Sequence, residues 1–451
     1  MLPTPIADFI DEYCSRGPAR FHMPGHKGRF LPECACDVTE FDGAGDLFAK
    51  DGIVVDSEAV ASSLFGCRTY YSTEGSSLVI RAMLALATRD GNRKVLAARN
   101  AHRAFLSAAI LLGLEVEWLC AERTDNLLHD GNAAEATCYL SCPLTARQVA
   151  AAIDACDRPP AAVYLTSPDY LGGMADVAAI ARVCREKGVL LLVDNAHGAY
   201  LKFLPVSRHP IDLGADLCAD SAHKTLPALT GGAYLHLSPA AASRFGDAVK
   251  ETMALFATSS PSYLILRSLD LVNRYLEDYP ARLEAFLTKT DALKRRLTDA
   301  GWSLPYDEPL KLTLAAKPYG YTGDDMAKRL YADDVIPEFY DPDFVTCMLT
   351  PENTDEELAR LEASLAALPK RSPMEQTPPP FRLPERAMSP REAFFSPRQT
   401  VSVEQSEGRI CASAAVACPP AVPVAVSGEV INREAVLLMQ YYGFETVSVV
   451  R

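Results

Sequence analysis

A lysine and an aspartate stand at a spacing that suits covalent catalysis by an amine. Lys224 ends the run Ser221-Ala-His-Lys, between a strand-like segment and a turn rich in Pro, Thr and Gly. A lysine in that setting could capture a carbonyl group, although a solvated surface ammonium is the ordinary role of a lysine. Thirty residues upstream, Asp194 ends the apolar run that begins at Leu190. The question is therefore whether Lys224 and Asp194 belong to one site.

The position of Asp194 sharpens this interpretation. An apolar strand that ends in Asp places a carboxylate at the carboxyl edge of a parallel sheet, where α/β proteins bind ligands. The same Asp could simply cap the next helix. A strand-end Asp followed thirty residues later by Ser-x-His-Lys224 is, however, the spacing of pyridoxal phosphate enzymes. In those enzymes Asp pairs with the pyridinium nitrogen, Lys forms a Schiff base, and the ring is an electron sink.

Two further groups fit a cofactor of this kind. Gly75, Ser76 and Ser77 precede an apolar helical pattern, so their N–H groups and hydroxyls could form a phosphate cradle at a helix N-terminus. The alternative is an ordinary Ser N-cap. His102 follows another strand-like run and could stack on a ring or move a proton, although a lone His there is more often structural.

The elements that must position these residues alternate along the chain. Helical and strand-like patterns alternate from about Val54 to Ser238, which predicts βαβ units and a mainly parallel sheet flanked by helices. Helices are expected at 76–87, 102–112, 177–187, 262–279, 281–300, 323–333 and 354–368, and strands at 94–98, 161–166, 189–193, 233–237, 311–316, 335–340 and 344–349.

Five regions follow from the changes in pattern. We expect an N-terminal arm over 1–53, a large domain with bridging helices over 54–300, a small α+β domain over 301–368, a Pro-rich linker over 369–390 and a C-terminal domain over 391–451. Length supports several domains, because 451 residues exceed what one hydrophobic core usually holds.

Composition narrows the classes of partner and compartment. Lys+Arg number 44 against 58 Asp+Glu, and a net charge of −14 argues against nucleic-acid binding. No apolar run approaches the ~20 residues that span a bilayer, and no secretory signal is expected. The 13 Cys form no CxxC pair, which suits reduced thiols in a cytoplasm and predicts no metal site.

These motifs, together with others along the chain, carry a family resemblance. They include His22-Met-Pro-Gly-His-Lys-Gly28, Thr258-Ser-Ser-Pro-Ser-Tyr263, Pro378-Pro-Pro380 and Gly428-Glu429. The sequence resembles the prokaryotic ornithine/lysine/arginine decarboxylases, in a short type without the N-terminal wing of the large enterobacterial members. The resemblance covers nearly the whole chain. It implies an aspartate-aminotransferase-like α/β fold (fold type I), a mainly parallel sheet in the large domain, a small α+β domain and an appended C-terminal domain.

The resemblance also implies roles and an activity. Lys224 would bind pyridoxal 5'-phosphate, Asp194 would hold the pyridinium proton, and His197 would lie near the reacting carboxylate. Ring, phosphate and substrate contacts would come from His102 and Ala196 on the ring, from Gly75, Ser76, Ser77, Ser221 and His223 at the phosphate, from Ser259 or Ser260 at the phosphate of a partner subunit, and from Glu338 at the distal cationic end of the substrate. The expected reaction is decarboxylation of arginine, lysine or ornithine, in polyamine-type metabolism. The expected assembly is a homodimer, or a set of dimers, with shared active sites.

Departures from the family pattern keep alternatives open. Glu74 stands where the phosphate loop usually has Asn, Asn195 where the family has Glu, and Ala421 where it has Gly. A carboxylate near a phosphate costs energy unless Glu74 turns away. Ala421 would strain a turn that needs φ > 0. An aminotransferase, a Cα–Cβ lyase or a weakly catalytic regulatory paralogue are therefore rivals, and Glu338 could be an ordinary surface carboxylate.

Overall fold

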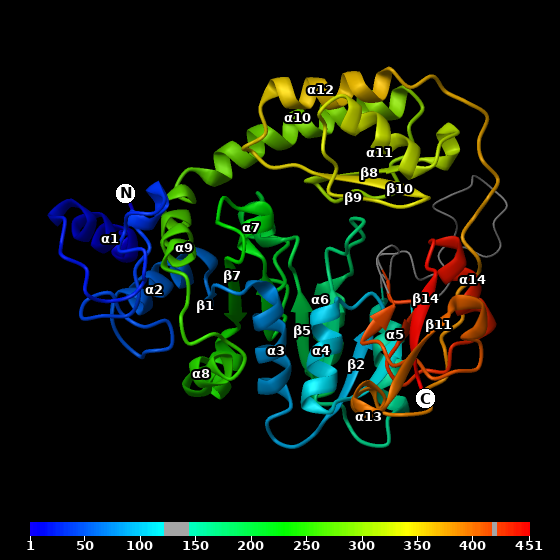
Figure 1. The fold of residues 1–451 in the computed structure, drawn as a ribbon, viewed down its shortest axis with the longest axis horizontal. Coiled ribbons are helices and arrows are strands. Elements are labelled where there is room, and N and C mark those ends of the chain that lie inside the picture. The colour runs from blue at the N-terminus through cyan, green and yellow to red at the C-terminus, as the bar shows by residue number, and fades with distance from the viewer. Residues whose placement is uncertain (121–143, 417–421) are drawn as a thin grey trace. The chain divides into compact units, whose positions relative to one another are not determined.

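The computed structural model describes residues 1–120, 144–416 and 422–451 (Figure 1). Ala421, whose effect on a turn is in question, lies outside the described residues. The chain forms two compact units: Met1–Asn92 with Asp157–Ser167 and Val177–Arg282, and Arg93–Cys156 with Pro168–Asp176 and Leu283–Arg451. Across the described ranges, no helix combines the length and apolar character needed to cross a membrane.

The first unit is built on a mixed, mainly hydrophobic sheet. Its described strands follow the order β1 (Arg68–Ser72), β7 (Ala233–Leu237), β6 (Leu217–Asp220), β5 (Leu190–Asp194) and β4 (Ala162–Thr166). β4, β5 and β6 run parallel, whereas β7 is antiparallel to both β6 and β1. β5 is an almost continuous run of Leu and Val because helices cover both faces of such a sheet. The parallel strands end together, which places Asp194 at the carboxyl edge.

Helices complete the first unit. They are α1 (Pro5–Arg16), α2 (Ile53–Phe65), α3 (Gly75–Ala87), α6 (Val177–Glu186), α7 (Ala222–Thr225), α8 (Pro239–Ala254) and α9 (Tyr263–Tyr275), with short 3₁₀ turns at Pro32–Ala35 and Ala199–Phe203. Figure 1 shows α3 lying along the sheet beside β7, and nine of its side chains are buried there. This burial fixes the N-terminus of α3, which carries the expected phosphate cradle.

The second unit contains two further structured regions and their connections. β2 (Lys94–Ala98) and β3 (Glu115–Leu119) pair in parallel, with α4 (Arg103–Leu112) between them in sequence and α5 (Ala146–Ala155) later. A sheet in the order β8 (Lys311–Ala315), β10 (Phe344–Met348) and β9 (Phe339–Tyr340) has α10 (Tyr279–Asp299), α11 (Gly323–Ala332) and α12 (Asp355–Ala366) on one side (Figure 1). A 3₁₀ turn covers Lys317–Tyr319.

The C-terminal part of the second unit has its own small core. β11 (Arg398–Ser402) pairs with β14 (Thr446–Val450), and β12 (Ala415–Val416) pairs with β13 (Ala425–Val426). Helices α13 (Pro390–Phe395) and α14 (Arg433–Tyr441) and a 3₁₀ turn at Val403–Gln405 complete it. Leu438, Met439 and Val449 are among the fully buried residues of one cluster that holds these elements together.

The expected fold class is confirmed, several elements end earlier than predicted, and one strand is much shorter. The strand predicted over 335–340 extends only over Phe339–Tyr340. Pro337 has no N–H for a sheet ladder, and Asp334 adopts φ = 54°, so the chain turns before it can pair. Glu338 consequently sits just ahead of the strand, where its N–H donates to Thr346 O at 2.9 Å.

Candidate active site

Lys224 lies in the one-turn helix α7, directly after β6. Its Nζ is 3.0 Å from Nε2 of His197, which follows β5 and is 4% exposed. An ammonium at Lys224 has only donors, so it donates to Nε2 of a neutral His197. The lysine is half-buried, so it is not a solvated surface group. It is a half-buried amine held beside an imidazole that can exchange a proton with it.

Asp194 is 1% exposed at the end of β5. Its Oδ2 accepts a hydrogen bond from the hydroxyl of Tyr164 at 2.9 Å, and its Oδ1 accepts from the N–H of Ala196 at 3.2 Å. Burial, reinforced by the charge of Asp194, raises the pKa of Tyr164 well above its usual value, so the hydroxyl keeps its proton. The bond to Ala196 is local and cap-like, but the bond to Tyr164 orients the carboxylate from a neighbouring strand.

The N-terminus of α3 provides hydroxyls rather than a Ser cap. Glu74 occupies the N-cap position without a side-chain cap bond, so the ordinary Ser N-cap alternative is wrong. Ser76, 8% exposed, receives a hydrogen bond at 2.9 Å from the hydroxyl of Ser221, which is fully buried after β6. The first turn of a helix leaves N–H groups without intrahelical partners, which favours an anion there. Two expected phosphate contacts are thus adjacent.

A glycine pair limits which atoms of this loop are free to bind. The N–H of Gly75 donates to Gly231 O at 2.7 Å, so this N–H is already used within the chain. Gly231 has φ = +102°, and a Cβ there would stand 2.8 Å from Thr73 O. Only glycine fits so close to the loop. The anion-binding capacity of the cradle therefore lies in the serines, not in the Gly75 N–H.

The unusual Glu74 has a defined partner. Its Oε1 accepts a hydrogen bond from the N–H of Thr258 at 2.6 Å. The carboxylate is therefore engaged with the segment that carries Ser259 and Ser260, both of which are exposed. This contact reduces the expected repulsion between Glu74 and a bound phosphate, because the carboxylate is hydrogen-bonded to Thr258 instead of facing the phosphate loop. The contact of Ser259 or Ser260 with a partner subunit stays a prediction.

The remaining predicted residues of the first unit lie close in sequence to these groups. Ala196, 6% exposed, forms the turn after Asp194. Nδ1 of His223 lies 2.9 Å from Gly232 O, which can only accept, so Nδ1 carries a proton. The structure thus brings together Lys224, His197 and the Ser76–Ser221 pair on neighbouring chain segments.

Two predicted residues belong to the second unit. His102 is exposed at the N-cap of α4, and its Nδ1 accepts from the N–H of Ala104 at 3.2 Å, so Nε2 carries the proton of the neutral ring. Glu338 is exposed, and its Oε1 accepts from the hydroxyl of Tyr170 at 3.1 Å. The expected ring contact of His102 and substrate contact of Glu338 stay predictions.

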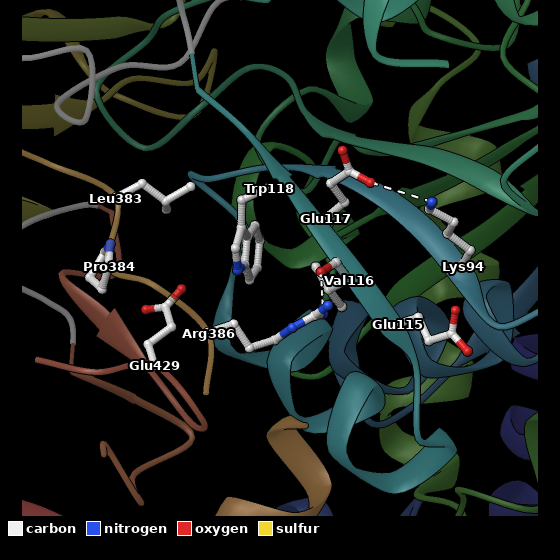
Figure 2. A pocket seen from close by; sticks show the side chains of 9 residues that line it. All are labelled: Lys94, Glu115, Val116, Glu117, Trp118, Leu383, Pro384, Arg386 and Glu429. Carbon is white, nitrogen blue, oxygen red and sulfur yellow. Dashed lines mark hydrogen bonds and ion pairs between the residues drawn. The ribbon is translucent and has the colours of Figure 1, made fainter. Parts of the chain in front are cut away.

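A pocket of about 470 Å³ in the second unit contains none of the predicted site residues. Residues 115–118 of β3 line it together with Leu383, Pro384 and Arg386, and Figure 2 shows Arg386 reaching Val116 beside Trp118. Arg386 donates to Val116 O at 2.9 Å. Glu429 on its wall forms a buried two-point ion pair with Arg99, at 2.6 and 2.9 Å. This side of the unit is a structural anchor for the C-terminal strands.

Sequence reasoning missed Tyr164, Asp220 and the two histidines around Asp220. Tyr164 lies in β4, the strand beside β5, so a tyrosine within a buried strand next to the strand-end Asp was the available signal. Asp220 directly precedes Ser221, yet its partners His209 and His236 are 11 and 16 residues away. No local spacing reveals that cluster.

The donor set of the first unit fits pyridoxal phosphate. It offers an amine at Lys224, a buried carboxylate that could pair with a ring nitrogen, and hydroxyls at a helix N-terminus for a phosphate. The half-buried amine is accessible to a carbonyl group, whereas Asp194 is shielded from water. A protonated ring nitrogen prefers such a carboxylate because low dielectric strengthens the pairing.

Comparison with known proteins agrees with this geometry. Residues 4–306 match the family model "Orn/Lys/Arg decarboxylase, major domain", and residues 375–447 match "Orn/Lys/Arg decarboxylase, C-terminal domain". An arginine decarboxylase of Bacillus subtilis is 28% identical over 96% of this chain and 92% of its own length. One from Halalkalibacterium halodurans is 28% identical over 95% and 91%.

Solved structures show the same fold. The lysine decarboxylase of Francisella novicida has a TM-score of 0.80 at 17% identity, covering 99% of this chain and 81% of that one. The constitutive lysine decarboxylase of E. coli has a TM-score of 0.76 at 17% identity, covering 100% and 82%. The major-domain match spans well over half of the sequence. The chain therefore belongs to the Orn/Lys/Arg decarboxylase family, whose members are pyridoxal phosphate-dependent carboxy-lyases.

Proposed function

We propose that this enzyme removes the α-carboxylate of arginine, lysine or ornithine as CO2 and releases the corresponding amine. The contact of Lys224 Nζ with His197 Nε2 at 3.0 Å carries the proposal, because it joins the cofactor-binding amine to a proton-transfer group. Arginine is the first substrate to test, since the relatives named above are arginine decarboxylases.

The residues of the first unit divide the work of this reaction. Bound pyridoxal phosphate supplies an electron sink for the electron pair left at Cα when the carboxylate departs. Lys224 holds the cofactor and accepts or returns a proton. Asp194, oriented by Tyr164, keeps a proton on the ring nitrogen. Ser76 and Ser221 bind the phosphate, with Gly75, Ser77 and His223 beside them.

His197 is assigned to the reacting carboxylate. At 4% exposure its imidazole is shielded from water, and Nε2 already faces the amine of Lys224. It can therefore receive the ammonium proton of Lys224 and help to return a proton to Cα. Decarboxylation requires the bond from Cα to the carboxylate to stand perpendicular to the ring, so fixed binding groups matter more than acid strength. His102 and Ala196 are the residues proposed to hold the ring between them.

Glu338 is assigned to the far end of the substrate. The hydroxyl of Tyr170 donates to one carboxylate oxygen and leaves the other to receive a guanidinium or ammonium. A charge-assisted bond of this kind is worth about 1.5–3 kcal/mol. The substrate's cationic end is what distinguishes basic amino acids from others, so this carboxylate would set the specificity.

The proposal includes assembly and setting. Ser259 and Ser260 are exposed and tethered through Thr258 to Glu74, which supports a role toward a partner subunit in a homodimer or an assembly of dimers. Mixing the inactive variants Lys224→Ala and Ser259→Ala/Ser260→Ala should then restore some activity. The described cysteines are all free thiols, which supports a cytoplasmic location. As the source of an amine, the enzyme would serve polyamine-type metabolism.

An amine-product assay on arginine, lysine and ornithine tests the proposal. One of them should give CO2 and the amine in equal amounts. With a 2-oxo acid added as amino acceptor, a keto acid instead of CO2 would favour an aminotransferase. Cleavage of a β-hydroxy amino acid to glycine and an aldehyde would favour a Cα–Cβ lyase, and no turnover with bound cofactor would favour a regulatory paralogue.

A substitution tests the specificity residue on the substrate so found. Glu338→Gln should lower kcat/KM by ~10- to 100-fold without altering the absorbance of the cofactor. Glu356→Gln, which changes an exposed carboxylate on α12 of the same unit, is the matched control and should have no effect. Equal kinetics in both variants would make Glu338 an ordinary surface carboxylate.

A further inference from the structure

A second buried carboxylate, Asp220, lies in the first unit and has no role in the reaction described above. It ends β6, is fully buried, and directly precedes Ser221. Side chains alternate between the faces of a strand, and Asp194 is paired in register with Ala219. Asp220 therefore points to the sheet face opposite that of Asp194. It is a buried acid behind the cofactor site rather than within it.

Four donors surround this carboxylate. Nε2 of His209 and Nε2 of His236 lie 3.1 and 3.2 Å from Oδ2. The side-chain amide of Asn195 donates to Oδ1 at 2.7 Å, and the thiol of Cys218 lies 3.5 Å from the same oxygen. All four partners are buried. The oxygen atoms of Asp220 are thus saturated, two donors on each.

The protonation states of this cluster follow from its contacts. The N–H of Ile211 donates to Nδ1 of His209, so Nε2 of His209 carries the proton that Asp220 accepts. Burial lowers the pKa of His236, which is therefore neutral. Its Nδ1 accepts a hydrogen bond from the hydroxyl of Thr69 at 2.9 Å. Although burial opposes ionisation, the two imidazoles hold the pKa of Asp220 well below its usual range. Asp220 is an anion held by neutral donors.

Metal binding is a weaker explanation of the same residues. His209, Cys218 and Asp220 are the one group among the described residues whose ligand atoms stand close enough to share an ion. However, the Nε2 atom of His209 donates its proton to Asp220, and His236 donates to the same oxygen. A metal would have to displace these hydrogen bonds. The cluster is therefore a completed hydrogen-bond network.

The network joins the two chain segments that carry the catalytic groups. Asn195 follows Asp194 directly and precedes His197 by two residues, and its N–H also donates to Ala219 O at 2.9 Å. Asp220 leads into Ser221 and the helix of Lys224. We propose that the bond between Asn195 and Asp220 is a positioning contact, which fixes the Asp194–His197 segment relative to the Ser221–Lys224 segment so that both meet the cofactor. This inference rests on the proposed cofactor site.

Asn195→Ala and Cys218→Ala form a matched pair that tests it. Each removes one donor from the same oxygen of Asp220, but only Asn195 belongs to a catalytic segment. Apo-protein is titrated with pyridoxal phosphate, and the melting temperature is measured in parallel. Asn195→Ala should raise the cofactor's Kd by about 10-fold, the loss that corresponds to one charge-assisted hydrogen bond. Cys218→Ala should stay within about two-fold of the wild type.

The opposite results would overturn the inference. If Asn195→Ala and Cys218→Ala have equal Kd values for the cofactor and similar melting temperatures, the network stabilises the fold and does not position the cofactor-binding segments. Wild-type protein that binds no pyridoxal phosphate would overturn the proposed function as well, so the two failures are distinguishable.

An exchange of partners supplies a second test. Asn195→Asp places two carboxylates 2.7 Å apart and should weaken cofactor binding more than Asn195→Ala does. Adding Asp220→Asn restores an amide–carboxylate pair with the roles exchanged. The double variant should bind the cofactor at least about 5-fold more tightly than Asn195→Asp alone. Independent effects of the two substitutions would contradict the proposed contact.

Discussion

Two buried charged sites, one in each unit, are stabilised in different ways. In the first unit, Asp194 and Asp220 are buried carboxylates that accept hydrogen bonds from uncharged hydroxyl, amide, imidazole, thiol and backbone groups. In the second, Arg99 and Glu429 neutralise each other in a fully buried two-point ion pair. A carboxylate that keeps its charge can still stabilise a cation that arrives with a ligand. A paired charge can only hold the structure together.

Breaking the anchor of the second unit should have the largest effect. Arg99→Met leaves Glu429 as an unpaired buried carboxylate and also removes bonds to Pro423 O and Val424 O. We expect a loss of about 3–5 kcal/mol in the free energy of unfolding, measured by urea denaturation. Arg99→Met/Glu429→Leu should recover most of that loss. A double variant as unstable as the single one would show that the ion pair, and not its desolvation, sets the stability.

Neutralising the carboxylate of the first unit should instead change chemistry. Asp194→Asn keeps the size of the side chain and the Tyr164 contact, but it cannot hold a ring proton by charge. Activity on the best substrate should fall on the order of 10²- to 10³-fold, with little change in melting temperature. Tyr164→Phe, which removes one hydrogen bond and leaves the charge, is the control and should lose only about 10-fold. A larger effect in Tyr164→Phe would assign the main role to the hydroxyl.

A third, smaller effect concerns a carboxylate of the second unit that is poorly paired. Burial, followed by the neighbouring charge of Asp343, raises the pKa of Asp341 to about 7. A raised pKa means that the folded chain binds this proton more tightly than the unfolded chain. Stability should therefore decline as pH rises from about 4 through 7, while Asp341 ionises.

Asp341→Asn tests this pH dependence. The amide oxygen still accepts from the N–H groups of Asp343 and Phe344, both at 2.8 Å. The variant should flatten the decline and be about 1–2 kcal/mol more stable at pH 8, measured by urea denaturation across pH. An unchanged slope would show that another group causes the pH dependence.

The sequence predicted the parts of the fold and site that depend on local pattern. β5 ends at Asp194, and α3 begins at Gly75, because an apolar run and a glycine-led helix start are local signals. The strand over 335–340 was predicted too long because the prediction rested on side-chain types and ignored that Pro337 has no N–H to donate. β3 was not predicted, although charged and apolar side chains alternate over Glu115-Val-Glu-Trp118.

The contacts that join distant segments could not be predicted. The sequence shows that a carboxylate at Glu74 costs energy near a phosphate unless it turns away, but not its partner Thr258, which is 184 residues away. Arg99 and Glu429 are 330 residues apart, and neither spacing nor composition pairs them. Such contacts form because buried polar groups must be satisfied once the chain is folded. Such contacts can be identified only from the folded structure.

The measurement that tests the account most directly is the chemical identification of the lysine that holds the cofactor. Purified protein is reconstituted with pyridoxal phosphate, reduced with borohydride, digested and mapped by mass spectrometry. The account predicts one pyridoxyl group per chain, on Lys224, and none in the Lys224→Ala variant. A pyridoxyl group on another lysine, or no incorporation into the wild-type protein, would contradict it.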